Sequence, residues 1–202
     1  DYLILFFFSL EIPSAMKYNI VFVGSIGAGK TSVITKFCRG KADPNTKSTI
    51  AVDYIPLSLG DVEVSVWDTC GQERFMSLTS SYFMRGHVFV LVHDISSSTI
   101  GDDLKQWYQR INASKPARHN PVVIVVSNKT DLAPFCEHTI EKWINEHHFD
   151  HVYTSAISGE GIEELFVQIK NAVLVHQSDW LAPSLPTLAA TDSLRTAPGC
   201  MC

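Results

Sequence analysis

The stretch VFVGSIGAGKTS places glycines, a lysine and a threonine at a spacing that suits phosphate binding. Gly24, Gly29, Lys30 and Thr31 satisfy the pattern G-x-x-x-x-G-K-[ST]. In such a loop, backbone N–H groups surround a phosphate and the following helix adds the positive end of its dipole. The lysine would reach the β and γ phosphates of a nucleotide, and the threonine hydroxyl would bind Mg²⁺. The predicted loop contacts are Ser25, Ile26, Gly27, Ala28, Gly29, Lys30, Thr31 and Ser32.

A second polar group, NKTD, follows the apolar run VVIVVS and is predicted to bind the base of the nucleotide. A buried Asp131 could accept two hydrogen bonds from guanine, whereas adenine would leave it unpaired at a cost of several kcal/mol. Asn128 and Lys129 would brace the loops and cover the base. In TSAIS, Ser155 precedes Ala156, whose N–H would meet the guanine carbonyl. The guanine motif disfavours a kinase or ATPase, which the phosphate loop alone leaves open.

A third group lies in VWDTCGQERF and would serve the γ-phosphate and its hydrolysis. Asp68 would hold Mg²⁺ through water, the Gly71 N–H would contact the γ-phosphate, and Gln72 would orient the attacking water. Thr49 would complete the Mg²⁺ shell. Because these residues join two loops to one phosphate, loss of that phosphate would release both loops. A GTP-binding module with little or no hydrolysis is the alternative.

The elements that must position these groups alternate between apolar β-rich runs and amphipathic helical patterns, which predicts a doubly wound, mostly parallel α/β sheet. We expect six strands, one of them antiparallel at an edge, because Gly60 and Asp61 separate two strand patterns and Pro56 interrupts the first. The expected strands are 18–23, 50–59, 62–67, 88–95, 122–127 and 152–154. The expected helices after the phosphate loop include 100–113, 140–147 and 162–175.

Composition limits the class of protein. A chain of 202 residues with 46% hydrophobic content can form one domain with a substantial core. A formal charge of −5 without a long basic stretch argues against nucleic-acid binding, and five scattered cysteines suit a reducing compartment. We expect a domain over 16–176 and a flexible tail over 177–202. Residues 1–15 are interpreted as an artefactual extension before Met16, or alternatively as a truncated signal or anchor.

From about Met16 to His176 the chain resembles the small GTPases of the Ras superfamily, and within them the Rab proteins. TIAVDY and VSVWDTCGQERF are similar to the two Rab switch segments, and SYFMRG and LVHDIS to the segments that follow. The resemblance implies a P-loop G domain, a monomer, that hydrolyses GTP with Mg²⁺ and regulates vesicle-mediated traffic. It also implies effectors, an exchange factor, a GTPase-activating protein (GAP), a prenyltransferase escort and a dissociation inhibitor.

The chain ends in Cys200-Met201-Cys202, which is similar to the Rab C-x-C signal for double geranylgeranylation. In a flexible terminus these cysteines have no packing role, so lipidation is the stronger interpretation. The protein is therefore expected in the cytoplasm, reversibly attached to the cytosolic face of an endomembrane. No polybasic cluster accompanies the tail, so both Cys200 and Cys202 should be needed for stable anchoring.

Several positions depart from the family pattern. Ala42 stands where an aromatic ring covers the guanine, and Thr46 where a switch tyrosine is usual, so nucleotide release should be fast. Ile26 replaces a small residue near the γ-phosphate, which predicts slow hydrolysis and weak GAP stimulation. Cys70 and Ile157 replace the usual alanine and lysine of their motifs. Cys70 is interpreted as a small core residue.

Three histidines, His147, His148 and His151, lie near Asp150 and could suggest a metal site. Their spacing matches no ligand set that favours a particular metal. The position after a predicted helix favours solvated side chains instead.

Overall fold

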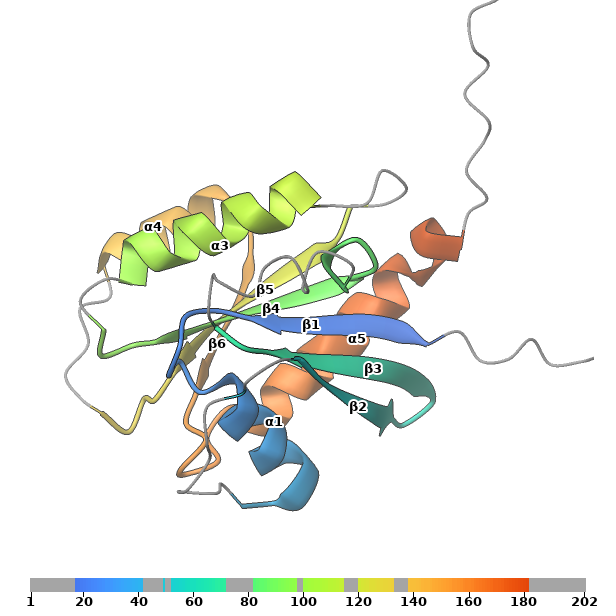
Figure 1. Ribbon diagram of the computed structural model, residues 1–202, viewed down its shortest axis with the longest axis horizontal. Coiled ribbons are helices and arrows are strands. Elements are labelled where there is room, and N and C mark those ends of the chain that lie inside the picture. Colours follow the sequence, from blue (N-terminus) through green and yellow to red (C-terminus); the bar gives the residue numbers. More distant parts are fainter. Residues whose placement is uncertain are drawn as a thin grey trace, which may run out of the picture.

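The computed structural model describes residues 17–41, 49, 52–71, 82–97, 100–114, 120–132 and 138–181. Within these residues six strands form one sheet in the order β2-β3-β1-β4-β5-β6 (Figure 1). Only β2 runs antiparallel to its neighbour, so the predicted mostly parallel sheet with one antiparallel edge strand is confirmed. The strands are β1 (Tyr18–Val23), β2 (Val52–Leu59), β3 (Val62–Thr69), β4 (Val88–Asp94), β5 (Val122–Asn128) and β6 (Asp150–Thr154).

The β2–β3 hairpin forms where the sequence predicts it. Leu59 pairs with Val62 across a turn made by Gly60 and Asp61. Gly60 has a φ of 73°, a left-handed conformation that glycine adopts without steric cost. Pro56 lies in β2, the outermost strand, and pairs with Ser65 of β3. An edge strand tolerates proline because it has no further neighbour that needs an N–H donor from it.

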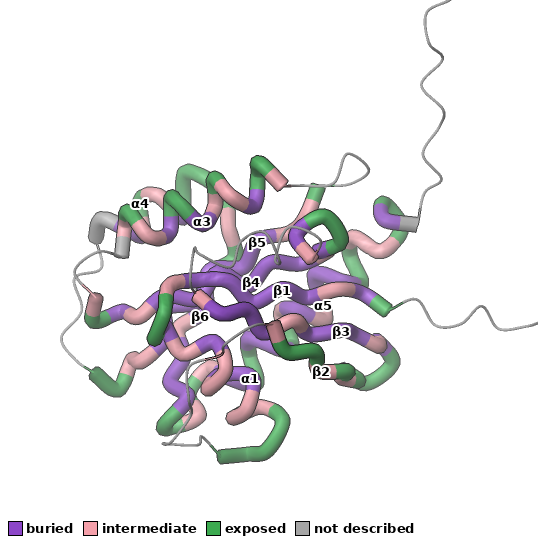
Figure 2. The backbone as a smooth tube through the Cα atoms, viewed as in Figure 1, coloured by how far each residue is buried: buried purple, intermediate pink, exposed green. Residues whose placement is uncertain are grey.

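Helices cover both faces of the sheet, so the central strands are buried on each side (Figures 1 and 2). One core joins the sheet to α1 and α5, through residues such as Ile34 and Leu165. The other joins it to α3 and α4, through residues such as Leu104 and Ile144. The helices are α1 (Lys30–Arg39), α3 (Ile100–Ser114), α4 (His138–Glu146) and α5 (Ile162–Leu181). None of the helices in the described part of the chain could span a bilayer.

The last helix extends beyond the range expected from sequence. α5 continues past Val175 to Leu181, so residues 177–181 are helical and not part of a flexible tail. The reason is tertiary: Trp180 is 9% exposed and lies with its ring centroid 5.8 Å from that of Tyr18 and 4.9 Å from that of His87. The Tyr18 hydroxyl also donates to Gln177 Oε1 at 3.3 Å. These contacts fix the end of α5 beside the beginning of β1.

The parallel strands end at one edge of the sheet, and the predicted functional residues lie at these ends. β1 leads into the phosphate loop, β3 carries Asp68 near its end and leads to Gly71, and β5 and β6 lead into the two guanine motifs. Ligands of doubly wound sheets bind at this carboxyl edge. The topology therefore brings together groups that are more than a hundred residues apart in the chain.

Candidate nucleotide site

In the loop between β1 and α1, the side chain of Lys30 contacts carbonyl groups of the loop itself. Lys30 Nζ donates to the carbonyl oxygens of Gly24 at 2.8 Å and Ser25 at 3.0 Å, and the residue is 5% exposed. Burial lowers the pKa of Lys30 to about 8, although electrostatic interaction with Asp68, and then with Cys70, acts to raise it. A buried ammonium that is bonded mainly to carbonyl dipoles is suited to receive an anion.

Gly29 begins the helix in a conformation that other residues avoid. Its φ is 94°, and a Cβ at this position would collide with the side-chain amide of Asn128. The Val33 N–H bonds to the Gly29 carbonyl at 2.9 Å, which starts α1. The glycine therefore serves two parts of the site, because it shapes the phosphate loop and leaves room for the guanine motif.

Three oxygen-bearing side chains converge beside the loop. Thr31 Oγ1 donates to Asp68 Oδ2 at 2.6 Å and lies 2.9 Å from Thr49 Oγ1, which in turn donates to Asp68 Oδ2 at 3.3 Å. Asp68 is 2% exposed, and its Oδ1 is buried without a hydrogen-bond partner among the described residues. Burial raises the pKa of Asp68, against the hydrogen bond from Thr31 and the charge of Lys30. Two hydroxyls and a carboxylate with a spare oxygen fit the hard ligand preference of Mg²⁺.

Gly71 brings the end of β3 against the phosphate loop. A Cβ on Gly71 would lie 2.5 Å from the Ile26 nitrogen and 2.6 Å from the Gly24 oxygen, so no larger residue fits without moving one of the two segments. Gly71 therefore lies against the phosphate loop, and contact of its N–H with a γ-phosphate stays a prediction. Ile26 itself is 56% exposed, so its side chain projects away from the protein core. Whether it approaches a phosphate stays a prediction.

Asn128 joins the guanine motif to both neighbouring loops. Its Nδ2 donates to the Ala28 carbonyl at 2.8 Å, and its Oδ1 accepts from Thr154 Oγ1 at 3.0 Å. Asn128 and Thr154 are 1% and 0% exposed, so water does not compete for these bonds. The predicted bracing by Asn128 thus has a definite form: one amide links the phosphate loop, β5 and β6.

Lys129 is held by a residue that the sequence interpretation did not include. Its Nζ lies 2.6 Å from Asp94 Oδ2, and Asp94 Oδ1 accepts from the N–H of Ser96 at 2.9 Å and from its hydroxyl at 2.6 Å. Lys129 has a φ of 69°, which is unusual for a residue with a side chain. The ion pair helps to hold this backbone. The available sequence signal was the position of Asp94 at the end of a buried strand.

Asp131 differs from its sequence prediction in one respect. It is exposed and not buried, so any desolvation of its carboxylate would have to come from a bound base. Its Oδ1 accepts from the Ser155 hydroxyl at 2.5 Å, which joins the two guanine motifs. Ser155 Oγ also accepts from the Ser158 N–H at 3.1 Å. Ala156, next to Ser155, is 6% exposed, whereas Ile157 is 72% exposed.

Trp107 on α3 is a second residue that the sequence interpretation missed. Its indole N–H donates to Ser25 Oγ at 3.4 Å, and the Arg110 guanidinium lies 4.7 Å from its ring centroid. No sequence motif indicated this contact, because α3 is far from the loop along the chain. Of the other predicted loop residues, Ser32 is half-buried in α1 and Gly27 is exposed.

Several predicted residues lie outside the described part of the chain. These are Gln72, Ala42, Thr46, Cys200 and Cys202. Cys70 is described and buried, as expected for a small core residue.

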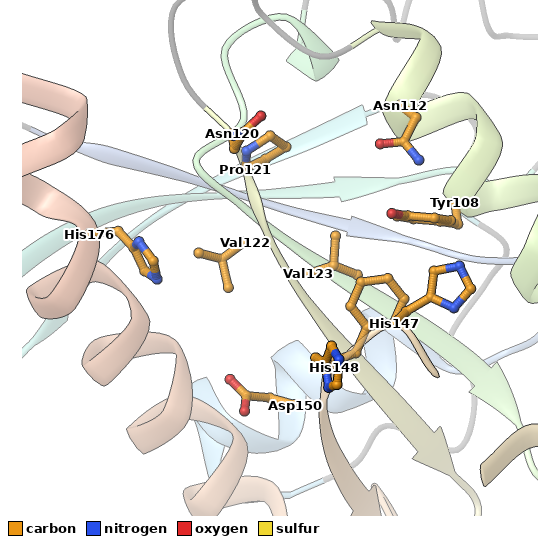
Figure 3. A pocket seen from close by; sticks show the side chains of 11 residues that line it. Tyr108, Asn112, Asn120, Pro121, Val122, Val123, His147, His148, Asp150 and His176 are labelled. Carbon is orange, nitrogen blue, oxygen red and sulfur yellow. The ribbon is translucent and has the colours of Figure 1, made fainter. Parts of the chain in front are cut away.

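The histidines near Asp150 divide into two groups. His147, His148 and Asp150 are exposed, as predicted, and help to line a pocket of about 380 Å³ at the amino ends of β5 and β6 (Figure 3). Tyr108 and His176 lie on its other sides. In the described ranges, no three His, Cys, Asp or Glu side chains are arranged to hold a metal ion.

His151 does not fit the prediction of a solvated side chain. It is half-buried, and its Nε2 lies 2.7 Å from the hydroxyl oxygen of Ser127 in the neighbouring strand. The difference arises because β6 lies beside β5, which no local sequence pattern reveals. His151 is therefore part of the sheet's hydrogen-bonded interior and not of the pocket.

Known proteins with similar sequences give a second line of evidence beside this geometry. A model of the Ras family matches residues 19–175. The Ras-related protein Rab-30 of Homo sapiens is 30% identical over 159 residues, which cover 75% of this chain and 77% of that protein. Rab-30 of Bos taurus matches with the same identity and coverage. The family match spans all the described groups at the carboxyl edge of the sheet, from the phosphate loop to the second guanine motif.

Proposed function

Because the chain belongs to the Ras family, we propose that it is a molecular switch that binds GTP and GDP with Mg²⁺ and hydrolyses GTP. One observation carries the proposal. At a single edge of the sheet, the buried Lys30 ammonium lies beside Asp68, whose Oδ1 is buried and unpartnered among the described residues. A polyphosphate with a divalent cation would satisfy both groups at once.

In this proposal the phosphate loop and Lys30 bind the β and γ phosphates, and Thr31, Thr49 and Asp68 hold Mg²⁺. When bound, Mg²⁺ would neutralise charge on the phosphate oxygens. The Gly71 N–H would contact the γ-phosphate, and Gln72 would orient the water that attacks it. The contact between Gly71 and the loop at Ile26 supports this placement.

Guanine selectivity would come from Asp131, held by Ser155 at 2.5 Å. Competition between labelled GDP and unlabelled GTP or ATP tests this directly, and we expect only GTP to compete. Asp131→Asn should shift preference toward xanthine nucleotides, because the amide can donate to the additional carbonyl. ATP competing as well as GTP would show that the guanine assignment is wrong.

Hydrolysis is proposed to be slow because of Ile26. A branched side chain beside the γ-phosphate would disturb the positioning of Gln72 and of a GAP arginine, and catalysis in this class depends on positioning. Single-turnover GTP hydrolysis by the wild type and by Ile26→Gly tests the proposal, with nucleotide affinity as the control. Equal rates would mean that the exposed Ile26 side chain stays clear of the phosphate. No hydrolysis by either protein would favour a GTP-binding module.

The finer role follows the similarity to Rab proteins. We place the switch in vesicle-mediated membrane traffic, with effectors, an exchange factor and a GAP as partners. Prenyl groups on Cys200 and Cys202 would attach it to the cytosolic face of an endomembrane, with a prenyltransferase escort and a dissociation inhibitor handling the lipids. Fractionation of the Cys200→Ser, Cys202→Ser double variant tests the attachment. Persistent membrane association of that variant would contradict it.

A further inference from the structure

Three polar side chains form a hydrogen-bonded row across β4, β5 and β6. His93 Nε2 and His151 Nε2 each lie 2.7 Å from Ser127 Oγ. His93 is 5% exposed and Ser127 is 2% exposed, whereas His151 at the outer strand is half-buried. The row therefore leads from the interior of the sheet toward its edge strand.

The hydroxyl of Ser127 has one hydrogen, so it can donate to only one of the two imidazoles. His93 Nδ1 is buried without a partner among the described residues. An unpaired buried N–H is rarer in proteins than an unpaired acceptor, which assigns the His93 hydrogen to Nε2. His93 then donates to Ser127, and Ser127 donates to His151.

Added protons affect the two histidines differently. Burial, and then the charge of His151, lower the pKa of His93 to about 4, whereas the main chain and the negative charge of Asp94 act to raise it. His93 therefore stays neutral at physiological pH. A proton on His151 would occupy its Nε2, the atom that accepts from Ser127. Both imidazoles would then donate to the same oxygen, and the Ser127 hydrogen would lose its acceptor.

Ionisable neighbours of the row lie on β4 and β6. Asp94 follows His93 on β4 and pairs with Lys129 at the end of β5. The Tyr153 ring on β6 lies 4.4 Å from the His151 ring, centroid to centroid. Side chains alternate along β4, so His93 faces the same side as Leu91, which α3 and α4 cover with apolar residues.

Each member of the row directly precedes, or shares a short strand with, a guanine-site residue. Ser127 precedes Asn128, which bonds to Ala28 and Thr154. His93 precedes Asp94, which holds Lys129. His151 belongs to β6, which ends at Thr154. A shift of the row therefore moves the ends of all three strands that carry the base site.

We propose that Ser127 is a positioning residue for guanine binding, and that protonation of His151 disrupts it and weakens nucleotide affinity as the pH falls. The inference rests on the proposed function, because it concerns the same base site. The direction of the pH dependence follows from the linkage between proton binding and nucleotide binding. The binding-competent row needs a neutral His151, so affinity is highest when His151 is unprotonated and declines as it gains a proton.

The experiment measures equilibrium binding of tritiated GDP in excess Mg²⁺ from pH 5.5 to 8. The wild type is compared with His151→Gln, whose amide can replace Nε2 but does not titrate. His148→Asn is the matched control, because His148 is an exposed imidazole that lies outside the row. The terminal phosphate of GDP also titrates near pH 6, but it contributes equally to every variant.

We expect wild-type affinity to fall between pH 7.5 and 5.5 by about fivefold to tenfold more than that of His151→Gln, since one pKa unit corresponds to tenfold. His148→Asn should follow the wild type. Ser127→Ala should bind GDP more weakly at every pH. If thermal unfolding shows that Ser127→Ala does not fold, the pH profiles of the wild type and His151→Gln still test the proposal.

Two results would overturn the inference while leaving the proposed function intact. One is an identical pH profile for the wild type and His151→Gln. The other is an NMR spectrum that places the hydrogen of neutral His93 on Nδ1. By contrast, a wild-type protein that fails to bind GDP at pH 7.5 would overturn the proposed function, and the inference with it.

Discussion

The phosphate side and the guanine side of the site are built differently. On the phosphate side, the buried Lys30 ammonium is bonded to loop carbonyls and Asp68 Oδ1 is left without a partner among the described residues. On the guanine side, Asn128 uses both ends of its amide, and Lys129 pairs with Asp94. The guanine side satisfies its own polar groups before any ligand arrives.

The difference separates two ways of preparing a site. Unsatisfied buried charge raises the free energy of the empty protein, and a ligand that neutralises it gains the corresponding affinity. Satisfied hydrogen bonds instead fix geometry, so that binding a base needs little rearrangement. The phosphate side should therefore contribute most of the affinity, and the guanine side most of the structural stability.

Removing the lysine should have the largest effect on binding. Lys30→Ala should weaken GDP and GTP by about a thousandfold, because charge-assisted hydrogen bonds to phosphate contribute about 1.5–3 kcal/mol each. The nucleotide-free protein should remain folded. Binding measurements beside Lys142→Ala, an exposed lysine on α4, provide the control. A loss below tenfold would contradict the division between the two sides.

Truncating the asparagine should instead destabilise the empty protein. Asn128→Ala should lower the free energy of unfolding by about 2–4 kcal/mol, because the Ala28 carbonyl and the Thr154 hydroxyl would be left unsatisfied in the interior. Urea denaturation without nucleotide measures this. Asn112→Ala, at an exposed position on α3, should change stability by less than about 0.5 kcal/mol. Equal stability of the two variants would contradict the proposed role of the guanine side.

Neutralising Asp68 should change the stability of the nucleotide-free protein in the opposite direction to Asn128→Ala. Asp68→Asn removes a buried charge while keeping an oxygen that can accept from Thr31, so stability without Mg²⁺ should rise by about 1–2 kcal/mol or stay unchanged. Nucleotide affinity in Mg²⁺ should fall. Asp102→Asn, at an exposed position on α3, controls for the loss of charge. Marked destabilisation by Asp68→Asn would show that the carboxylate is already satisfied.

The smallest effect is expected at Asp94. Burial acts to raise the pKa of Asp94, but hydrogen bonds from Lys129 and Ser96 prevail and lower it. A carboxyl with a lowered folded-state pKa stabilises the fold above its unfolded pKa near 4, and this stabilisation disappears as the pH falls through the folded value. Asp94→Asn should therefore cost about 0.5–1 kcal/mol at pH 7, since the pair is partly exposed. At pH 3 the cost should be smaller.

The role of the Asp94 charge is checked by measuring the stability cost of Asp94→Asn at both pH 7 and pH 3. Glu146→Gln, in the exposed pair with Lys142, should show almost no effect at either pH. A cost for Asp94→Asn that is the same at pH 3 and pH 7 would mean that charge plays no part in holding Lys129.

Local sequence patterns predicted the features that depend on neighbouring residues. The phosphate loop requires glycines and a lysine within one turn, and the β2–β3 hairpin requires Gly60 and an edge proline, Pro56. Both signals are short-range, because backbone conformation at a turn is set by the residues in it. The structure agrees with sequence in both places.

Features that depend on strand order were not visible. The row of His93, Ser127 and His151 exists because β4, β5 and β6 are neighbours in parallel register. The end of α5 was missed for a similar reason, since Trp180 is buried only by contact with Tyr18 from the other end of the domain. The only local signal for the row is a polar residue in an otherwise apolar strand, such as Ser127 in VVIVVSN.

The contact between α3 and the phosphate loop gives the protein an intrinsic optical reporter. The Trp107 indole donates to Ser25 Oγ at 3.4 Å and has the Arg110 guanidinium 4.7 Å from its ring centroid. Indole emission responds to hydrogen bonding and to nearby charge, so any movement of Ser25 on nucleotide loading would change the intrinsic fluorescence. Trp180, packed against Tyr18 and His87 at the end of α5, would supply a steady background. Nucleotide exchange could then be followed in real time on the unlabelled protein, with Trp107→Phe as the reference that gives the combined signal of Trp67, Trp143 and Trp180.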